Sequence, residues 1–371
     1  MLVRRVMCAT LLAALAALLL APAGKAGGDI KRDEEVVFFP TYAYLDTDHE
    51  NWVIPTHGWI YEPEKDSASR EALIALIARK LGLDARDTES KTFKERARLF
   101  LVDNERGKKI TIHFGTRAYP LNASLSNGHF RTSVYVPVTA LKALAAKQNV
   151  REDWLQFRAV TRRRDKRIFA GAVQFLAPTG VSVISDIDDT IKVTNVRDKK
   201  ALVRNTFLRE FEAVPGMAEL YQQWAEKGVR FHYVSSCPWQ LYEPLWTFVA
   251  RSGFPLGSFR LKTFRWKDRS FFSLFASPEV TKPKDINTIL RRYPERKFIL
   301  VGDSGEKDPE IYAAIAEKSP RQIVGICIRN VTGEAVDSNR YRQCFGKVPR
   351  GKWIVFDKPA EIRAKSSRLL K

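Results

Sequence analysis

From residue 181 onward, short apolar segments alternate with helical segments, and this alternation limits the fold more than any other feature of the chain. The apolar segments are rich in β-branched residues and end at turn residues, as β-strands do. Strands joined by helices form a parallel sheet that is covered on both faces. We therefore expect an α/β domain built on such a sheet. The predicted strands are 181–185, 230–235, 297–302, 322–328 and 353–356, and the predicted helices are 217–227, 238–252, 284–293 and 309–318.

The preceding part of the chain is dominated by predicted strands. β-branched and aromatic residues recur between turn signals, of which Asn127-Gly128 is the strongest. One helix is expected at residues 69–81, because leucine and isoleucine recur there at four-residue spacing. We expect a smaller β-rich domain, either a sandwich or a barrel. Its predicted strands are 36–39, 52–61, 98–102, 109–114, 130–138, 155–160 and 168–175.

The chain begins with the pattern of a secretory signal peptide. Arg4 and Arg5 precede an apolar run from residue 11 to residue 20, and small residues follow as far as Ala26. The run is short for a membrane span, which needs about 20 apolar residues. We expect export to the periplasm or the extracellular space, with membrane association if the leader is kept as an anchor. The expected division is a signal peptide at 1–26, a β-rich domain at 29–177 and an α/β domain at 178–371.

The formal net charge of +20 favours anionic partners such as acidic lipid headgroups, polyphosphates or nucleic acid, although solubility alone would also explain it. A basic turn at residues 162–167 is either a solvated loop tip or an anion-binding tip. With 45% hydrophobic and 28% charged residues, the composition excludes a disordered chain and a multi-span membrane protein. Cys237, Cys327 and Cys344 follow the leader and allow one disulfide at most, which excludes a disulfide scaffold.

Acidic residues gather where two of the predicted parallel strands end. Asp186 and Asp188 follow the first strand, and Asp303 and Asp308 follow the third. Ligands of such folds bind at the carboxyl ends of the strands. Carboxylates packed closely repel one another unless a cation joins them, and Mg²⁺ prefers oxygen ligands. The sequence therefore predicts an all-oxygen metal site at this edge of the sheet.

Two further side chains could bind a phosphate beside these acids. Ser235 ends the second strand, and its hydroxyl can donate to a phosphoryl oxygen. Lys282 precedes the third strand and offers a fixed positive charge. Lys284 is the alternative, because the Lys-Pro-Lys string leaves the start of this helix uncertain.

In their order along the chain, these residues resemble the four motifs of the haloacid dehalogenase (HAD) superfamily, the first of which is Asp-x-Asp-x-Thr. Three longer strings, 211–217, 231–242 and 302–312, resemble the catalytic domain of the actin-patch-protein type of phosphatidate phosphatases. The chain departs from this family at Ser236 and Cys237, where Asn and Ser are usual, and it keeps Ser235.

The resemblance implies a HAD-like fold and a Mg²⁺-dependent phosphatase. Asp186 would attack phosphorus and form an aspartyl-phosphate, while Asp188 would protonate the leaving alcohol and later deprotonate water. Ser235 and Lys282 would stabilise the transferring group. The implied metal ligands are Asp186, the backbone carbonyl of Asp188, Asp303 and Asp308, the last directly or through a bound water.

The expected substrate is a phosphate ester, and a lipid phosphate such as phosphatidate is the leading hypothesis. A phosphatase for a soluble phosphomonoester, such as a nucleotide or phosphoprotein, is the alternative, and a non-catalytic anion-binding module is the third. Residues 259–275 interleave basic and aromatic side chains, which suits either an anionic membrane surface or ordinary packing. We expect neither a nucleic-acid partner nor an obligate protein partner.

Overall fold

The computed structural model describes residues 29–63, 68–141, 153–263, 281–365 and 369–370. The predicted signal peptide and most of the basic and aromatic segment at 259–275 lie outside the described residues. Among the described helices, none combines the length and the apolar character needed to cross a bilayer. Contacts between residues divide the chain into two compact units, Met1–Pro63 with Asp103–Phe175, and Glu64–Val102 with Leu176–Lys371.

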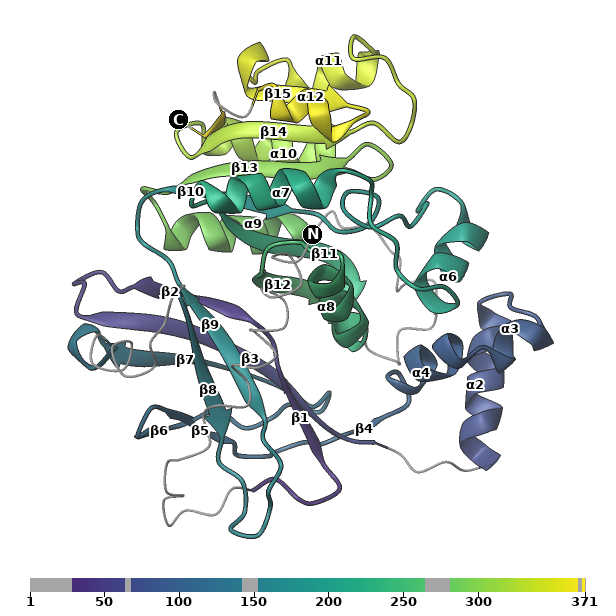
Figure 1. Ribbon diagram of the computed structural model, residues 1–371, viewed down its shortest axis with the longest axis vertical. Coiled ribbons are helices and arrows are strands. Elements are labelled where there is room, and N and C mark those ends of the chain that lie inside the picture. The colour runs from purple at the N-terminus through teal and green to yellow at the C-terminus, as the bar shows by residue number, and fades with distance from the viewer. Residues whose placement is uncertain (1–28, 64–67, 142–152, 264–280, 366–368, 371) are drawn as a thin grey trace, which may run out of the picture. The chain divides into compact units, whose positions relative to one another are not determined.

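The first unit is a nine-stranded, mostly antiparallel sheet, in which β1, β3, β2, β9, β8, β5 and β6 are neighbours in that order, and β4 and β7 also pair with β3 (Figure 1). The ring centres of Phe38 on β1 and Phe157 on β8 lie 5.0 Å apart, although these strands are not neighbours in the sheet. The sheet therefore folds over a shared apolar core, as in a sandwich. Its strands are β1 (Glu35–Phe38), β2 (Thr41–Leu45), β3 (Asn51–Glu62), β4 (Asp103–Asn104), β5 (Thr111–Phe114), β6 (Arg117–Pro120), β7 (His129–Pro137), β8 (Trp154–Ala159) and β9 (Ala170–Phe175).

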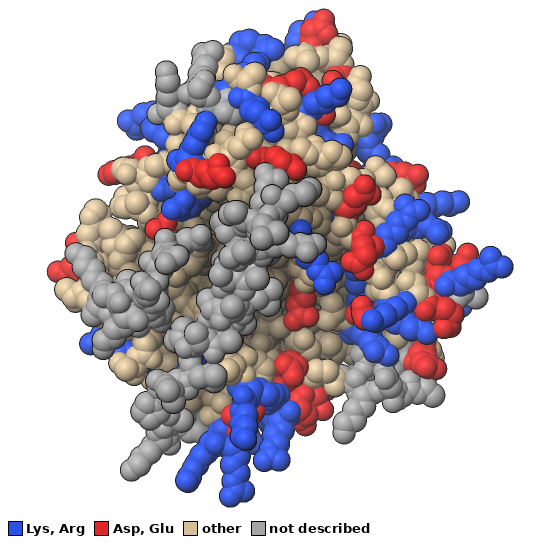
Figure 2. Space-filling view, in the orientation of Figure 1, with Lys and Arg blue, Asp and Glu red and all other residues tan. Residues whose placement is uncertain are grey.

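Lysine and arginine side chains are spread over the visible face of the molecule and gather at the end of the β8–β9 hairpin, at the lower edge of the view (Figure 2). This hairpin end is the basic turn at residues 162–167, where the side chains of Arg162, Arg163, Arg164 and Lys166 are exposed. The high net charge is thus partly concentrated at one loop.

The second unit contains a six-stranded parallel sheet in the order β12-β11-β10-β13-β14-β15, which confirms the expected α/β fold. Four of the five residues of β10 are buried, because strands in such a sheet face helices on both sides. The strand β12 was not predicted from the sequence. The strands are β10 (Val181–Ser185), β11 (Arg230–Pro238), β12 (Gly257–Lys262), β13 (Lys297–Asp303), β14 (Ile323–Arg329) and β15 (Trp353–Phe356).

Helices cover both faces of this sheet (Figure 1). The four predicted helices correspond to α7 (Met217–Glu226), α8 (Tyr242–Arg251), α9 (Thr281–Arg292) and α10 (Asp308–Lys318). The sequence did not predict α6 (Lys199–Phe207), α11 (Asn339–Phe345) or α12 (Pro359–Arg363).

A helical segment between β3 and β4 belongs to the second unit by its contacts. It consists of α2 (Ala68–Lys80), which agrees with the predicted helix, α3 (Ala85–Glu89) and α4 (Lys91–Arg98). Apolar side chains of α2 and α4, among them Ile77 and Phe93, form one core with Val203 and Phe207 of α6. The proposed domain limits at 29–177 and 178–371 stay a prediction, and this segment is the part of the first range that packs with the parallel sheet's unit.

The predicted strand at 98–102 is wrong. Ser90 caps α4 by accepting a hydrogen bond from the Phe93 amide, and the helix runs to Arg98. A turn follows, in which Phe100 and Leu101 pack on the core shared with α6. The apolar run Leu99–Val102 looked like a strand because a short apolar segment gives the same signal in either state.

The position of β10 in the sheet locates a binding crevice. From β10 the chain continues to β11 on one side, and β13 lies on the other side. At such a topological switch point the loops leave the carboxyl edge in opposite directions, and ligands bind between them. The loops after β10 and β13 carry the predicted acidic residues.

Candidate active site

The loop after β10 holds Asp186 in a fixed orientation. The amides of Ile191 and Lys192 donate to the carbonyl of Ile187, so the chain turns back immediately after the strand. The hydroxyl of Thr190 donates to Asp186 Oδ2 over 3.1 Å. Asp186, the predicted nucleophile, is only 1% exposed.

Asp189 stabilises the same loop through hydrogen bonds to its backbone. Its backbone has a φ of 55°, and its carboxylate accepts hydrogen bonds from the amides of Thr194, Asn195 and Val196. Asp189 therefore caps the turn that follows the strand instead of facing a substrate.

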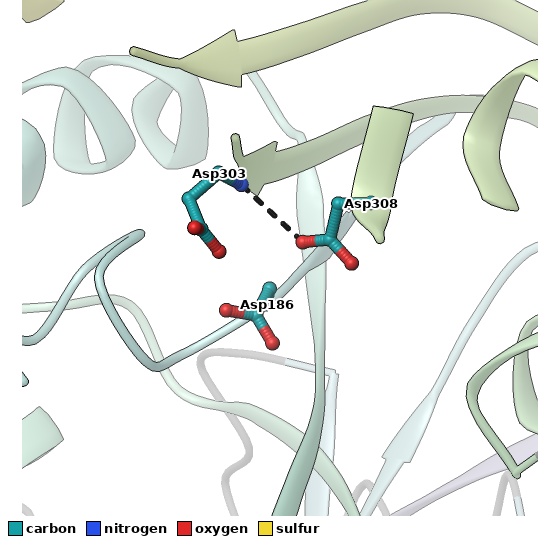
Figure 3. A group of neighbouring side chains, drawn as sticks. All are labelled: Asp186, Asp303 and Asp308. Carbon is teal, nitrogen blue, oxygen red and sulfur yellow. Dashed lines mark hydrogen bonds between the residues drawn. The ribbon is translucent and has the colours of Figure 1, made fainter. Parts of the chain in front are cut away.

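The loop after β13 brings Asp303 and Asp308 to Asp186. One carboxylate oxygen from each of these three residues lies within 4.8 Å of the others (Figure 3). The amide of Asp303 donates to Asp308 Oδ2 over 3.3 Å, and the amide of Gly305 donates to Asp303 Oδ1 over 2.6 Å. The predicted carboxylates from two separate loops thus meet in one buried cluster.

This cluster fits a divalent cation that prefers oxygen. Burial raises the pKa of Asp186 and of Asp303 well above the usual value, and the neighbouring carboxylates raise it further. Asp303 Oδ2 is buried and has no hydrogen-bond partner among the described residues. A cation would keep the acids ionised and would satisfy this oxygen, and an all-carboxylate donor set suits Mg²⁺ better than a transition metal.

Lys282 is the lysine that reaches the site. It is 2% exposed, and its Nζ lies 2.9 Å from Asp186 Oδ1 and 2.5 Å from Asp308 Oδ1. Burial alone would lower its pKa, but Asp186 and Asp308 raise it well above the usual value, so this lysine stays charged. Lys284, the alternative, is exposed on the same helix.

The carboxylate of Asp188 accepts hydrogen bonds from donors that do not contact the cluster of Asp186, Asp303 and Asp308. Its Oδ2 accepts from Ser235 over 2.9 Å, and its Oδ1 accepts from Thr194 over 2.9 Å and pairs with Lys192 Nζ at 2.8 Å. Burial would raise the pKa of Asp188, but Lys192 and these hydrogen bonds lower it overall. The Asp188 carboxylate is therefore not part of the cluster of three, and its backbone carbonyl stays the predicted metal ligand.

Ser235 lies beside Asp188 rather than beside the carboxylate cluster. Besides donating to Asp188, its hydroxyl accepts a hydrogen bond from the Cys237 amide over 2.9 Å. Both contacts hold the hydroxyl at the carboxyl end of β11, where the sequence predicted it.

Two charged residues of the site were missed. Lys192 is 1% exposed and pairs with Asp188, although nothing in its position after Ile191 distinguishes it from a surface lysine. Glu306 lies 3.8 Å from Lys282, and burial together with Asp308 raises its pKa to about 7, against the opposing effect of Lys282. Its place in the acid-rich loop between Gly302 and Asp308 was a signal that could have identified it.

A cavity of about 540 Å³ lies beside this loop. Its walls are mainly polar and include Arg197, Glu306, Lys307 and Arg340. Arg340 is held by Glu310 at 2.9 Å and by the carbonyls of Ser304 and Glu306. The cavity adjoins the acidic cluster through Glu306, so a group attached to a bound phosphate would find polar surroundings here.

A parallel sheet with three buried carboxylates and a buried lysine at its switch point agrees with what the motif resemblance to the HAD superfamily implied. More narrowly, residues 181–330 match the family described as "Phosphatidate phosphatase APP1, catalytic domain". The resemblance seen in the motif strings is confirmed for this part of the chain.

Two curated proteins share this region. "Phosphatidate phosphatase APP1" of Saccharomyces cerevisiae is 37% identical over 159 residues, which cover 42% of this chain and 27% of the relative. An uncharacterized protein of Schizosaccharomyces pombe is 31% identical over 172 residues, which cover 45% of this chain and 28% of that protein. The chain thus spans little more than a quarter of the length of these relatives.

Among solved structures, a D,D-heptose 1,7-bisphosphate phosphatase from B. bronchiseptica, complexed with magnesium and phosphate, gives a TM-score of 0.30 at 12% identity and covers 50% of this chain and 97% of that one. A likeness this distant shows nothing beyond what the sheet topology shows by itself.

Proposed function

We propose that this chain is a divalent-metal-dependent phosphatase that hydrolyses a phosphate monoester through an aspartyl-phosphate. One observation carries the proposal: the buried carboxylate of Asp186 lies between a charged lysine and two further carboxylates at the switch point of the sheet. Perturbed acids in such a crevice are typical of reacting groups.

In the first step, an oxygen of Asp186 attacks phosphorus, and the bond between phosphorus and the leaving oxygen breaks. Because Lys192 lowers the pKa of Asp188 in the free site, Asp188 must bind a proton when the phosphate monoester binds, and it then gives this proton to the leaving oxygen. Ser235 and Thr194 hold the carboxyl of Asp188 in place for this transfer. In the second step, Asp188 takes a proton from water, which attacks phosphorus and releases phosphate from Asp186. Lys282 offsets the negative charge at Asp186 throughout.

The residues that would hold Mg²⁺ are Asp186, Asp303, Asp308 and the backbone carbonyl of Asp188. When bound, the cation supplies positive charge that draws the phosphate to the buried carboxylates and offsets charge in the transition state.

The substrate we propose first is a lipid phosphate such as phosphatidate, because the yeast relative is named for that activity. A soluble phosphomonoester is the second candidate, and it is favoured by the polar walls of the cavity beside Glu306. Export from the cytoplasm and contact with an anionic membrane surface are part of the first proposal, since both would bring the chain to a lipid.

The proposal is tested by phosphate release from the purified chain and from Asp186→Asn, each with Mg²⁺ and with EDTA. Turnover should require Mg²⁺ and vanish in the variant. Equal release from the variant or in EDTA would refute the mechanism. A substrate panel then compares phosphatidate in vesicles with glycerol phosphate and a nucleoside monophosphate, and the preferred substrate decides between the two candidates.

A further inference from the structure

The helical segment α2–α4 lies outside the residues that match the phosphatase family, yet a series of contacts connects it to the proposed acid–base group. Arg96 of α4 is 5% exposed, and its Nη1 donates to the carbonyls of Thr206 and Arg209, each over 2.7 Å. Both carbonyls lie at the end of α6 or just after it. Arg96 thus joins α4 to the polypeptide that follows the loop of Asp186.

A single aromatic ring connects Arg96 to the site. The guanidinium carbon of Arg96 lies 4.0 Å from the centre of the Phe211 ring, and Lys192 Nζ lies 4.7 Å from the same centre. A cation over an aromatic face is attracted by the ring quadrupole, more strongly when it is removed from water. Phe211 is therefore held between contacts with two buried cations.

The backbone reinforces this connection. The amide of Val193 donates to the carbonyl of Glu212, and the amide of Val214 donates to the carbonyl of Ile191. These bonds tie the residues around Lys192 to the residues after Phe211. A shift of Phe211 would therefore move Lys192, which pairs with Asp188 at 2.8 Å.

We propose that Arg96 is a positioning residue for Asp188. It acts through Phe211 and Lys192, so the helical segment α2–α4, which packs on α6, helps to set the orientation of the acid–base carboxyl. This inference rests on the proposed phosphatase function and adds to it a residue far from the family's motifs.

If Arg96 positions Asp188, the loss of activity on replacing Arg96 should depend on the leaving group of the substrate. Asp188 protonates the departing oxygen, which matters much for an alkyl phosphate and little for p-nitrophenyl phosphate, whose leaving group is stable as an anion. Arg96→Met should lower kcat/KM for glycerol phosphate about tenfold or more, as loss of a supporting residue does elsewhere. The loss for p-nitrophenyl phosphate should be much smaller, and Asp188→Asn should show the same contrast.

Lys91→Met is the matched control, because Lys91 lies on the same helix with its side chain 89% exposed. Arg96→Lys keeps the charge over the ring and should recover part of the activity. If Arg96→Met does not fold, Phe211→Leu tests the same connection from its centre. Thermal unfolding of each variant is measured alongside.

Equal losses on both substrates, or losses that follow the melting temperature alone, would overturn the positioning role. A wild-type chain without Mg²⁺-dependent turnover would instead refute the proposed function, and the two failures are therefore distinguishable.

In the β-rich unit, the contacts of Arg167 at the end of the β8–β9 hairpin support a second inference. Arg167 turns inward, where it donates to the carbonyls of Lys31 and Glu34 over 2.7 and 2.6 Å and pairs with Asp165 at 2.7 Å. Arg32 is close enough to Asp165 to contribute to the lowering of its pKa, after the hydrogen bonds from Arg167. The clamp by Arg167 thus fixes the hairpin end against the segment before β1.

This clamp gathers five exposed cations in what we call the basic tip: Arg32, Arg162, Arg163, Arg164 and Lys166. None of them forms an ion pair with another described residue. Ile168, in the same loop, is 59% exposed. An aliphatic side chain gains free energy by leaving water, which a lipid interface permits and a polyanion in water does not.

We infer that the basic tip docks on an anionic lipid surface, with Ile168 entering the interface. The test is sedimentation with vesicles of phosphatidylcholine, alone or with about one-third phosphatidylserine. Replacing Arg162, Arg163 and Arg164 together by Gln should weaken binding to the anionic vesicles on the order of a hundredfold. Phosphate release from p-nitrophenyl phosphate should not change.

The matched control replaces Lys227, Arg251 and Lys318, which are exposed in the other unit, by Gln. It removes the same charge and should bind vesicles nearly as the wild type does. Ile168→Ser should weaken the binding that remains at high salt. The inference fails if the tip variant binds like its control, if anionic and neutral vesicles bind equally, or if duplex DNA is bound in preference to vesicles.

Discussion

The α-carbon of Gly302 faces the carboxylate of Asp308 so closely that a Cβ at position 302 would overlap Asp308 Oδ2. The last residues of β13 and the first residue of α10 can therefore meet only where position 302 has no side chain. This close approach lets Asp308 share a site with Asp186 and Asp303.

Gly302→Ala should displace the Asp308 carboxylate and weaken the metal site. We expect the Mg²⁺ concentration for half-maximal phosphate release to rise about tenfold to a hundredfold. Gly253→Ala is the control, because Gly253 has a φ of +76° and open space around it, so alanine there adds only backbone strain. An unchanged Mg²⁺ requirement in Gly302→Ala would show that Asp308 does not contribute to metal binding.

Lys282→Met removes the buried cation next to Asp186 and Asp308. Because uncompensated buried charge is costly, the free energy of unfolding in EDTA should fall by about 3–5 kcal/mol. Mg²⁺ should restore part of it, and phosphate release should fall on the order of a hundredfold or more. Urea unfolding with and without Mg²⁺ measures the first effect. Lys284→Met, on the exposed face of the same helix, should change neither quantity.

Asp188→Asn and Asp189→Asn test whether the first acid acts in catalysis and the second stabilises the loop. Asp188→Asn keeps the shape of the side chain but cannot transfer the proton, so kcat should fall by roughly a hundredfold to ten-thousandfold. Stability should fall as well, because the buried Lys192 loses its carboxylate partner. Asp189 accepts three backbone hydrogen bonds, so Asp189→Asn should lower the free energy of unfolding by about 1–3 kcal/mol. The distinct roles assigned to the two acids would be wrong if Asp189→Asn, measured where both variants are folded, lost as much kcat as Asp188→Asn.

Acid should destabilise the β-rich unit through His129. Burial, followed by the charge of Arg131, lowers the pKa of this side chain to about 3, so it is neutral in the folded chain at neutral pH. The unfolded chain binds the proton below a pKa of about 6.5, so stability is complete above that pH and falls as the pH drops toward 3. The expected slope is about 1.4 kcal/mol per pH unit.

The test is urea unfolding of the wild type and of His129→Gln at several pH values between about 3, the pKa in the folded chain, and about 6.5, the pKa in the unfolded chain. In the variant, the free energy of unfolding should change less steeply with pH, because one proton fewer is taken up on unfolding. His49→Asn, at an exposed histidine, is the control for replacing a histidine elsewhere in the same unit. Identical slopes in all three proteins would mean that His129 is not buried as a neutral group.

Much of the parallel sheet could be predicted, because each of its five predicted strands is a short apolar run ending in turn residues. The strand β12 escaped because Gly257–Lys262 mixes apolar and basic residues, and only pairing with β11 makes it a strand. In the segment between β3 and β4, Leu99–Val102 was misassigned because its apolar residues follow a helix end that packs on α6.

The sequence by itself determined the alternation of strands and helices and the order of the acidic motifs, because periodicity and turn residues act over a few neighbours along the chain. Only the tertiary structure decided which carboxylates meet. It grouped Asp186 with Asp303 and Asp308, turned Asp188 toward Lys192, and brought Arg96 to Phe211. The contacts of Asp186 with Asp303 and of Arg96 with Phe211 join residues far apart in the chain, and burial raises the pKa of Asp186 and Asp303, so no local pattern of residues encodes the site.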